Sequence, residues 1–213
     1  MKMNSCIVFD LDGTLIDSRE DLTTGVNLMR AHFGLEGLSV DTVTSYVGNG
    51  ARNLAIRALQ GHDADIEHAL SLMKKFYSEN MLVKTHLYPG VAEGLGKLHS
   101  KGWKLAVITN KPSPAANEIL EKLKVKKYLS YVLGGDSAFP LKPDPASLIY
   151  VLNETSSLPE KSWMLGDNYT DLEAGRRAGI KRCFARYGFG RQGNENYDAA
   201  IDSFDGILKL LLP

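Results

Sequence analysis

The feature that most constrains the fold is an alternation of short apolar runs with amphipathic helical segments in the second half of the chain. The apolar runs lie at 103–109, 131–133, 162–165 and 180–185, and helical patterns begin near 113, 144 and 172 between them. Strands that alternate with helices predict a parallel sheet covered by helices on both faces. A further apolar run, from Cys6 to Phe9, predicts another strand of the same sheet near the N-terminus.

The segment between this first strand and the alternation shows helical spacing and no strand pattern. Leu22, Val26, Met29 and Phe33 recur at helical intervals, and a later helix carries Ile66, Leu70, Met73 and Tyr77. We therefore expect an α/β fold. Its core would be a doubly wound, Rossmann-like parallel sheet formed by residues 1–15 and 86–213, with residues 16–85 inserted as an all-helical cap.

Polar clusters follow four of the predicted strands. They are Asp10 with Asp12, Thr109 with Asn110, Lys142, and Asp167 with Asp171. In a parallel sheet the carboxyl ends of the strands lie along one edge, where open α/β folds form their binding sites. We therefore expect all four clusters to converge there.

Carboxylates gathered at this edge repel one another and require a cation. Asp10, Asp12 and Asp167 could surround one ion with oxygen atoms, the ligand type that magnesium prefers. Zinc is disfavoured because the clusters contain no His or Cys. Asp171, four residues after Asp167, could hold a metal-bound water or orient Lys142.

These side chains suit displacement at phosphorus. A carboxylate such as Asp10 can act as the nucleophile, which divides one difficult displacement into two easier ones. Asp12 could protonate the leaving group and later deprotonate water. Lys142 would contribute a fixed positive charge for the phosphoryl oxygens, while the Thr109 hydroxyl and the Asn110 backbone would donate hydrogen bonds to them.

The same residues carry a family resemblance. The segments Asp10-Leu-Asp-Gly-Thr-Leu-Ile-Asp-Ser18, Thr109-Asn110, Leu141-Lys-Pro-Asp-Pro145 and Gly166-Asp-Asn-Tyr-Thr-Asp171 resemble the four signature motifs of the haloacid dehalogenase-like hydrolase superfamily. They occur in order and span essentially the whole chain. Within the superfamily the chain is similar to the phosphoglycolate phosphatase group.

The resemblance implies particular roles. It makes Asp10 the nucleophile and Asp12 the acid and base, and it places Mg²⁺ on the Asp10 carboxylate, the Asp12 carbonyl and Asp167. The second Asp of the first motif also argues against dehalogenase activity, because the dehalogenases of this superfamily lack it.

A Gly-rich loop in the helical segment is a candidate for substrate contact. The segment Val47-Gly-Asn-Gly-Ala-Arg52 resembles the substrate-facing loop of the cap in this group. Arg52 could reach a carboxylate or other distal group of the substrate, or it could be a solvated helix residue, and Asn49 is a weaker candidate for the same role. Lys111 follows Asn110, and we interpret it as a surface residue in preference to a second phosphate contact.

The function expected from these features is magnesium-dependent hydrolysis of a small, phosphoglycolate-like phosphomonoester through an aspartyl-phosphate. A sugar phosphomutase of the β-phosphoglucomutase type, or a pyrophosphatase or nucleotidase, would share the fold and the intermediate. A receiver domain that binds partners when its Asp is phosphorylated would also use acidic, Thr and Lys residues. Receiver domains, however, place that Asp after a middle strand and have no cap.

The composition of the chain limits the classes of partner that it is expected to bind. The 25 Lys and Arg balance the 25 Asp and Glu, so the chain lacks the basic surface expected of a nucleic-acid binder. No apolar stretch approaches the roughly 18 residues that suggest a membrane span. We therefore expect a cytoplasmic enzyme that binds a small phosphorylated metabolite, neither nucleic acid nor membrane, while its oligomeric state is not indicated.

Overall fold

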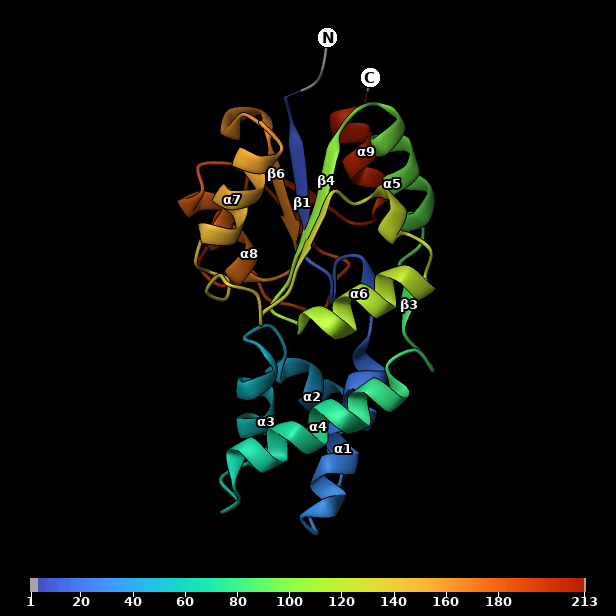
Figure 1. Ribbon diagram of the computed structural model, residues 1–213, viewed down its shortest axis with the longest axis vertical. Coiled ribbons are helices and arrows are strands. Elements are labelled where there is room, and N and C mark those ends of the chain that lie inside the picture. Colours follow the sequence, from blue (N-terminus) through green and yellow to red (C-terminus); the bar gives the residue numbers. More distant parts are fainter. Residues whose placement is uncertain (1–3, 213) are drawn as a thin grey trace.

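The structure, a computed structural model, describes residues 4–212, and within this range six strands form one parallel sheet (Figure 1). Across the sheet they are β5 (Tyr131–Leu133), β4 (Lys104–Ile108), β1 (Cys6–Phe9), β6 (Trp163–Gly166), β7 (Lys181–Ala185) and β8 (Ala199–Ile201). The chain begins in the middle, adds strands on one side of β1, and then crosses to the other. This order confirms the predicted doubly wound α/β fold.

Helices cover both faces of the sheet. In Figure 1, α5 (Val91–Ser100) and α9 (Asp205–Leu211) lie on one side, and α7 (Ala146–Glu154) and α8 (Tyr169–Arg177) lie on the other. Helix α6 (Ser113–Lys122) packs with the α5 side, and the short 3-10 helices η1 (Lys126–Tyr128) and η2 (Pro159–Lys161) lie in connections.

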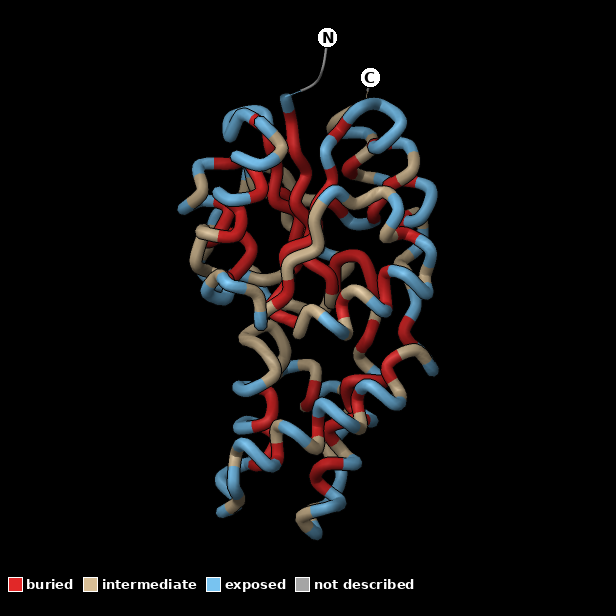
Figure 2. The backbone as a smooth tube through the Cα atoms, in the orientation of Figure 1, coloured by how far each residue is buried: buried red, intermediate tan, exposed pale blue. Residues whose placement is uncertain are grey.

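Strand β1 shows why its sequence is apolar throughout. Ile7 and Phe9 point into the core under α5, α6 and α9, while Cys6 and Val8 point into the core under α7 and α8. Side chains alternate between the two faces of a strand, and both faces are covered here. The burial colours of Figure 2 show the same result, with red strands inside and pale blue helix surfaces outside.

Four helices form a bundle at the carboxyl edge of the sheet. They are α1 (Arg19–His32), α2 (Val40–Tyr46), α3 (Ala51–Leu59) and α4 (Ile66–Asn80), and α1 packs chiefly against α4. At Gly25 the two helices approach so closely that an added Cβ would lie 3.0 Å from the Tyr77 backbone. Asp65 caps α4 by accepting hydrogen bonds from the Glu67 and His68 backbone N–H groups.

Two very short strands connect this bundle to the sheet. Strands β2 (Ile16–Asp17) and β3 (His86–Leu87) pair antiparallel, with Ile16 opposite Leu87. The expectation that 16–85 contains no strand is therefore wrong at its first two residues. Two residues are too few to show the alternation by which a strand is recognised.

The other differences from the sequence interpretation also concern short elements or boundaries. Strand β8 and helix α9 follow the predicted last strand, and β8 has only three residues. Helix α6 begins at Ser113, near where the sequence pattern predicts a helix to begin, with Pro112 as its cap residue. Within residues 4–212 we find no helix with both the length and the apolar character required to cross a membrane.

Candidate active site

The segments that follow three strands bring a buried lysine between two carboxylates. Asp10 follows β1, Asp171 opens α8 after β6, and Lys142 lies in the connection from β5 to α7. The Lys142 ammonium is 2.7 Å from Asp10 Oδ1 and 2.7 Å from Asp171 Oδ1, and it also donates to the Ile108 carbonyl at 2.6 Å. Asp171 therefore contacts Lys142 directly, as its predicted role in orienting Lys142 requires.

Three buried carboxylates form a compact cluster beside this lysine. Asp10, Asp167 and Asp171 each offer one oxygen, and these oxygens lie within 4.8 Å of one another. Burial, together with the charges of Asp10 and Asp171, raises the pKa of the Asp167 carboxyl well above its ordinary value. Burial also raises the pKa of Asp171 to about 7, although the neighbouring Lys142 ammonium opposes the shift. The raised pKa values show that these carboxyls resist ionising together when only the Lys142 ammonium balances them.

This cluster fits a divalent cation. Its donors are all oxygen, as magnesium requires. The Phe189 and Gly190 backbone N–H groups donate to Asp167 Oδ2 at 3.0 and 2.7 Å, which fixes this carboxylate in place. At Gly13, where φ is +84°, an added Cβ would lie 1.9 Å from the same oxygen, so only glycine leaves the space free. Asp10 and Asp167 belong to the predicted metal set, and Asp171 is the third carboxylate beside them.

The Asp12 side chain has separate partners. Its carboxylate accepts hydrogen bonds from the Lys111 ammonium at 2.9 and 3.1 Å and from the Ser18 hydroxyl at 2.5 Å. The interpretation of Lys111 as a surface residue is wrong, because its side chain is only 3% exposed. Burial alone would lower the pKa of Lys111, but the Asp12 carboxylate, together with Tyr77, more than offsets this and raises it.

Thr109 and Asn110 lie at the same edge, after β4. Thr109 is buried, and its hydroxyl accepts a hydrogen bond from the Lys111 backbone N–H at 3.2 Å. The Asn110 side chain accepts from the Lys142 backbone N–H at 2.9 Å and donates to the Lys142 and Gly48 carbonyls at 3.0 and 2.9 Å. Asn110 therefore links the Lys142 loop to the loop that precedes α3.

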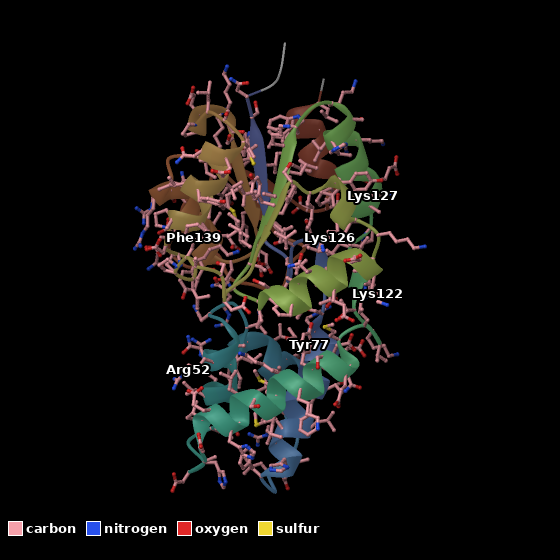
Figure 3. All side chains as sticks on the ribbon, viewed as in Figure 1. Arg52, Tyr77, Lys122, Lys126, Lys127 and Phe139 are labelled. Carbon is pink, nitrogen blue, oxygen red and sulfur yellow. The ribbon has the colours of Figure 1, made fainter. Side chains whose placement is uncertain are left out.

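Two predicted substrate contacts are not brought to this site. Arg52 is exposed and pairs with Glu67 at 3.0 Å, and Figure 3 shows it at the edge of the helical bundle. Asn49 donates to the Tyr169 hydroxyl at 2.8 Å and accepts from Arg57 at 2.9 Å. In this structure both side chains are engaged by neighbours outside the cavity described next. This pairing could not be predicted from a local sequence pattern, because Glu67 lies fifteen residues after Arg52.

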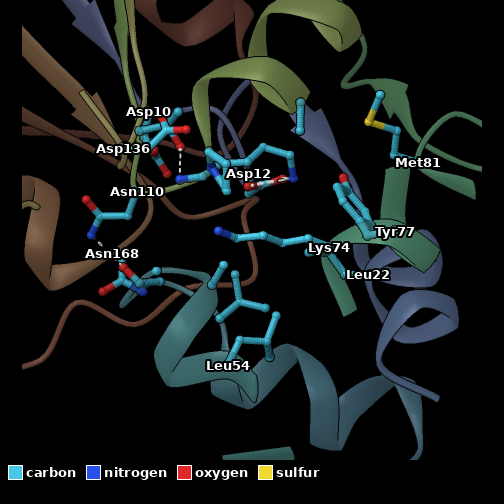
Figure 4. A pocket seen from close by; sticks show the side chains of 18 of the residues that line it. Asp10, Asp12, Leu22, Leu54, Lys74, Tyr77, Met81, Asn110, Asp136 and Asn168 are labelled. Carbon is cyan, nitrogen blue, oxygen red and sulfur yellow. Dashed lines mark hydrogen bonds and ion pairs between the residues drawn. The ribbon is translucent and has the colours of Figure 1, made fainter. Parts of the chain in front are cut away.

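A cavity of about 330 Å³ separates the sheet edge from the helical bundle. On the sheet side, Asp10, Asp12, Thr109, Asn110, Lys142 and Asp167 line it. On the helical side its lining includes Lys74 and Tyr77 of α4, which Figure 4 shows extending into the cavity. Sequence reasoning missed both of these as site residues, since Tyr77 reads as part of the apolar face of α4 and Lys74 as a solvated lysine.

Comparisons with known proteins give consistent results. A family model described as haloacid dehalogenase-like hydrolase matches residues 7–185. The phosphoglycolate phosphatase of Aquifex aeolicus is 36% identical over 96% of this chain and 95% of its own length, and that of Psychrobacter arcticus is 38% identical over 97% and 95%. The crystal structure of a predicted phosphoglycolate phosphatase from Haemophilus somnus is 31% identical and superposes with a TM-score of 0.92 over 99% of this chain and 98% of that one.

Proposed function

The chain belongs to the haloacid dehalogenase-like hydrolases and is a phosphoric monoester hydrolase, and we propose that it hydrolyses a small, phosphoglycolate-like phosphomonoester with Asp10 as nucleophile and Mg²⁺ as cofactor. The observation that carries this proposal is the placement of Lys142, whose ammonium lies 2.7 Å from Asp10 Oδ1 at the base of the cavity. A buried cation beside the attacking oxygen is positioned to bind a phosphoryl group that Asp10 can reach.

In the first step, an Asp10 carboxylate oxygen attacks phosphorus. A bond forms between Asp10 and phosphorus, and the ester P–O bond breaks. Asp12 enters this step carrying a proton and gives it to the leaving oxygen, so that the alcohol departs neutral and Asp12 becomes the carboxylate that pairs with Lys111. Lys142 and the Thr109 hydroxyl, with the Asn110 backbone N–H, are the groups that bind the phosphoryl oxygens during the transfer.

In the second step, water attacks the phosphorus of the aspartyl-phosphate. The water gives a proton to Asp12, the bond from phosphorus to the Asp10 oxygen breaks, and inorganic phosphate leaves. Asp10 is ionised again and Asp12 is protonated again, so both residues return to their starting states. Lys111 and Ser18 hold the Asp12 carboxylate in place for both proton transfers.

Magnesium would be held by the Asp10 carboxylate, the Asp12 carbonyl and Asp167, with Asp171 next to them. When bound, the ion supplies positive charge that neutralises the carboxylates and the phosphoryl oxygens. Asp171 contributes by fixing Lys142 at 2.7 Å. The backbone N–H groups of Phe189 and Gly190 keep Asp167 aimed at the cluster.

We further propose that residues 16–85 act as a cap over a core formed by residues 1–15 and 86–213. The placement of α1–α4 across the cavity from the sheet edge supports this division. The cap would exclude water from the aspartyl-phosphate until the alcohol has left. Its hinges would lie at the two connections near β2 and β3, at residues 15–17 and 84–87.

A substrate panel tests the function. Purified protein with Mg²⁺ should release phosphate from 2-phosphoglycolate, and candidate substrates should be ranked by kcat/KM. Conversion of β-glucose 1-phosphate to glucose 6-phosphate, without release of phosphate, would favour a mutase instead. A failure to release phosphate from every small phosphoester would refute the proposal.

A further inference from the structure

Tyr77 carries a buried polar atom without a partner. The residue is 8% exposed, it lines the cavity from α4, and its hydroxyl makes no hydrogen bond to any residue from 4 to 212. The Lys111 ammonium lies over the Tyr77 ring, 4.4 Å from its centroid, and already donates to Asp12. Buried hydroxyls are normally hydrogen-bonded, so an unpaired one at a cavity wall is free to bond to a ligand that enters the cavity.

The Tyr77 hydroxyl is suited to donate a hydrogen bond to an anion. Burial is the main cause that raises its pKa to about 12, and the nearby Lys111 charge only partly opposes the shift. The hydroxyl therefore keeps its proton at neutral pH. In Figure 4 the ring stands at the wall of the cavity opposite Asp10 and Asn110.

Lys74 lies one helical turn before Tyr77 on the same face of α4 and extends into the same cavity. Across residues 4–212 no carboxylate oxygen lies within 4.0 Å of its ammonium. Glu118 and Asp136 also line the cavity from the sheet side. Although burial opposes the shift, hydrogen bonds from Ser113 and, with the smallest effect, the Lys74 charge lower the pKa of Asp136. The Asp136 carboxylate accepts from the Ser113 backbone N–H at 2.7 Å and forms no ion pair with Lys74. The Lys74 charge is thus available to a ligand.

The other cations of the cavity are already engaged. Lys142 contacts Asp10 and Asp171, and Lys111 contacts Asp12. A phosphoryl group beside Lys142 and Asp10 leaves the rest of the substrate facing α4. The Ser78 hydroxyl of α4 also lines the cavity but already donates to the Lys75 carbonyl at 2.7 Å. The donors that remain on α4 are the Lys74 ammonium and the Tyr77 hydroxyl, and together they match a carboxylate, which accepts hydrogen bonds only.

We propose that Lys74 and Tyr77 of helix α4 bind the carboxylate that a phosphoglycolate-like substrate bears on its leaving group, and so select it over neutral phosphomonoesters of the same size. This inference rests on the proposed phosphatase function. Helix α4, and not the loop at Asn49 and Arg52, then contacts the leaving group of the substrate.

The experiment compares two substrates that differ in one group. They are 2-phosphoglycolate, which has the carboxylate, and 2-hydroxyethyl phosphate, in which a CH₂OH group replaces it. The variants are Lys74→Gln and Tyr77→Phe, with Lys75→Gln as a control because Lys75 is exposed and does not line the cavity. Thermal unfolding of each variant establishes that it is folded before kcat/KM is measured.

We expect Lys74→Gln to lower kcat/KM for 2-phosphoglycolate by about tenfold to 100-fold, the usual effect of losing a charged hydrogen bond, with less than about a threefold change for 2-hydroxyethyl phosphate. Tyr77→Phe should show the same selectivity with a smaller loss. Lys75→Gln should change neither substrate.

Other outcomes would overturn the assignment. An equal loss on both substrates in Lys74→Gln would show that Lys74 acts by pairing with Glu118 or Asp136 across the cavity. A wild-type enzyme that hydrolyses both esters equally well, unaffected by either variant, would refute the carboxylate site while leaving the phosphatase intact. A wild-type protein inactive on every phosphoester would instead refute the proposed function itself, and this inference with it.

Discussion

The Lys111 ammonium lies 2.9 Å from Asp12 Oδ1 and 3.1 Å from Oδ2, although the two residues are 99 positions apart in the sequence. The pair joins the loop after β1 to the loop after β4, next to the proposed nucleophile. Both side chains are largely buried, at 3% and 11% exposed. Such a pair holds Asp12, the proposed acid and base, in position, and each partner depends on the other for its charge balance.

Lys111→Met should lower the free energy of unfolding by about 3–5 kcal/mol, because it leaves the Asp12 carboxylate without a cation. The double variant Lys111→Met with Asp12→Asn should recover at least about 1 kcal/mol of this loss, which urea unfolding can measure as a coupling. Lys122→Met, at an exposed position on α6, is the control. Equal stability of Lys111→Met and Lys122→Met would contradict the role of the pair.

Asp10→Asn should abolish turnover, reducing kcat by about a thousandfold or more, because the amide cannot form the aspartyl-phosphate. Asp41→Asn, which changes an exposed acid on α2, should retain full activity. Phosphate release under saturating substrate checks the effect, and circular dichroism checks folding. Activity in Asp10→Asn close to that of the wild type would rule out Asp10 as nucleophile.

Magnesium should stabilise the folded chain, because it neutralises three carboxylates whose oxygens lie within 4.8 Å of one another. At a concentration 100 times its dissociation constant, a ligand specific for the folded state adds about 2.7 kcal/mol to the free energy of unfolding. Thermal unfolding with and without Mg²⁺, at matched ionic strength, measures the effect. Asp167→Asn should unfold at a higher temperature than the wild type without metal and should lose the response to Mg²⁺. A full response in that variant would show that the ion binds elsewhere.

Gly13→Ala should impair both stability and activity, because its Cβ would lie 1.9 Å from Asp167 Oδ2. Gly102→Ala is a matched control: φ is +88° at Gly102 and +84° at Gly13, but nothing lies within 4 Å of a Cβ at Gly102. Both variants bear the backbone strain of about 1–2 kcal/mol. Only Gly13→Ala should also weaken magnesium binding, measured by calorimetry. Equal magnesium affinities would show that the crowding at Asp167 has no consequence.

The two thiols predict a pH dependence at alkaline pH. Burial raises the pKa of both Cys6 and Cys183 from 9.0 to about 12, so between these values the folded state keeps protons that the unfolded state has lost. The free energy of unfolding should therefore fall as the pH rises above 9, by about 1.4 kcal/mol per thiol and pH unit. Replacing both cysteines with alanine should flatten the urea-unfolding profile above pH 9. An unchanged slope would contradict this origin.

The core fold and the polar residues at the sheet edge could be predicted because they depend on local patterns. The apolar run from Cys6 and the two acids that follow it, Asp10 and Asp12, span only seven residues of the sequence, and parallel pairing then brings Lys142 and Asp167 to the same edge. The short strands β2 and β8 could not be predicted this way. With two and three residues, they exist through pairing with distant partners and not through a pattern of their own.

The remaining site residues depend on contacts that no local pattern encodes. Lys111 and Lys122 look alike in the sequence, and only the tertiary position of Asp12 makes one of them buried and paired. Tyr77 follows Met73 at the spacing of residues on the buried face of a helix. That spacing is the same whether the buried face packs against another helix or lines a cavity. Arg52 looks like a ligand-binding residue until Glu67 is brought beside it.

The pairing of Ile16 with Leu87 and of Asp17 with His86 places the start and the end of the helical segment next to each other. A segment whose two junctions are neighbours can be replaced as a unit, because a replacement segment needs only to begin and end at two adjacent, paired strands. If the proposed cap sets substrate preference, that preference can change in evolution by replacement of this segment, while the chemistry proposed for Asp10 stays the same. A chimera that joins this core at residues 15 and 88 to the helical segment of a relative would inherit the chemistry of one parent and the selectivity of the other.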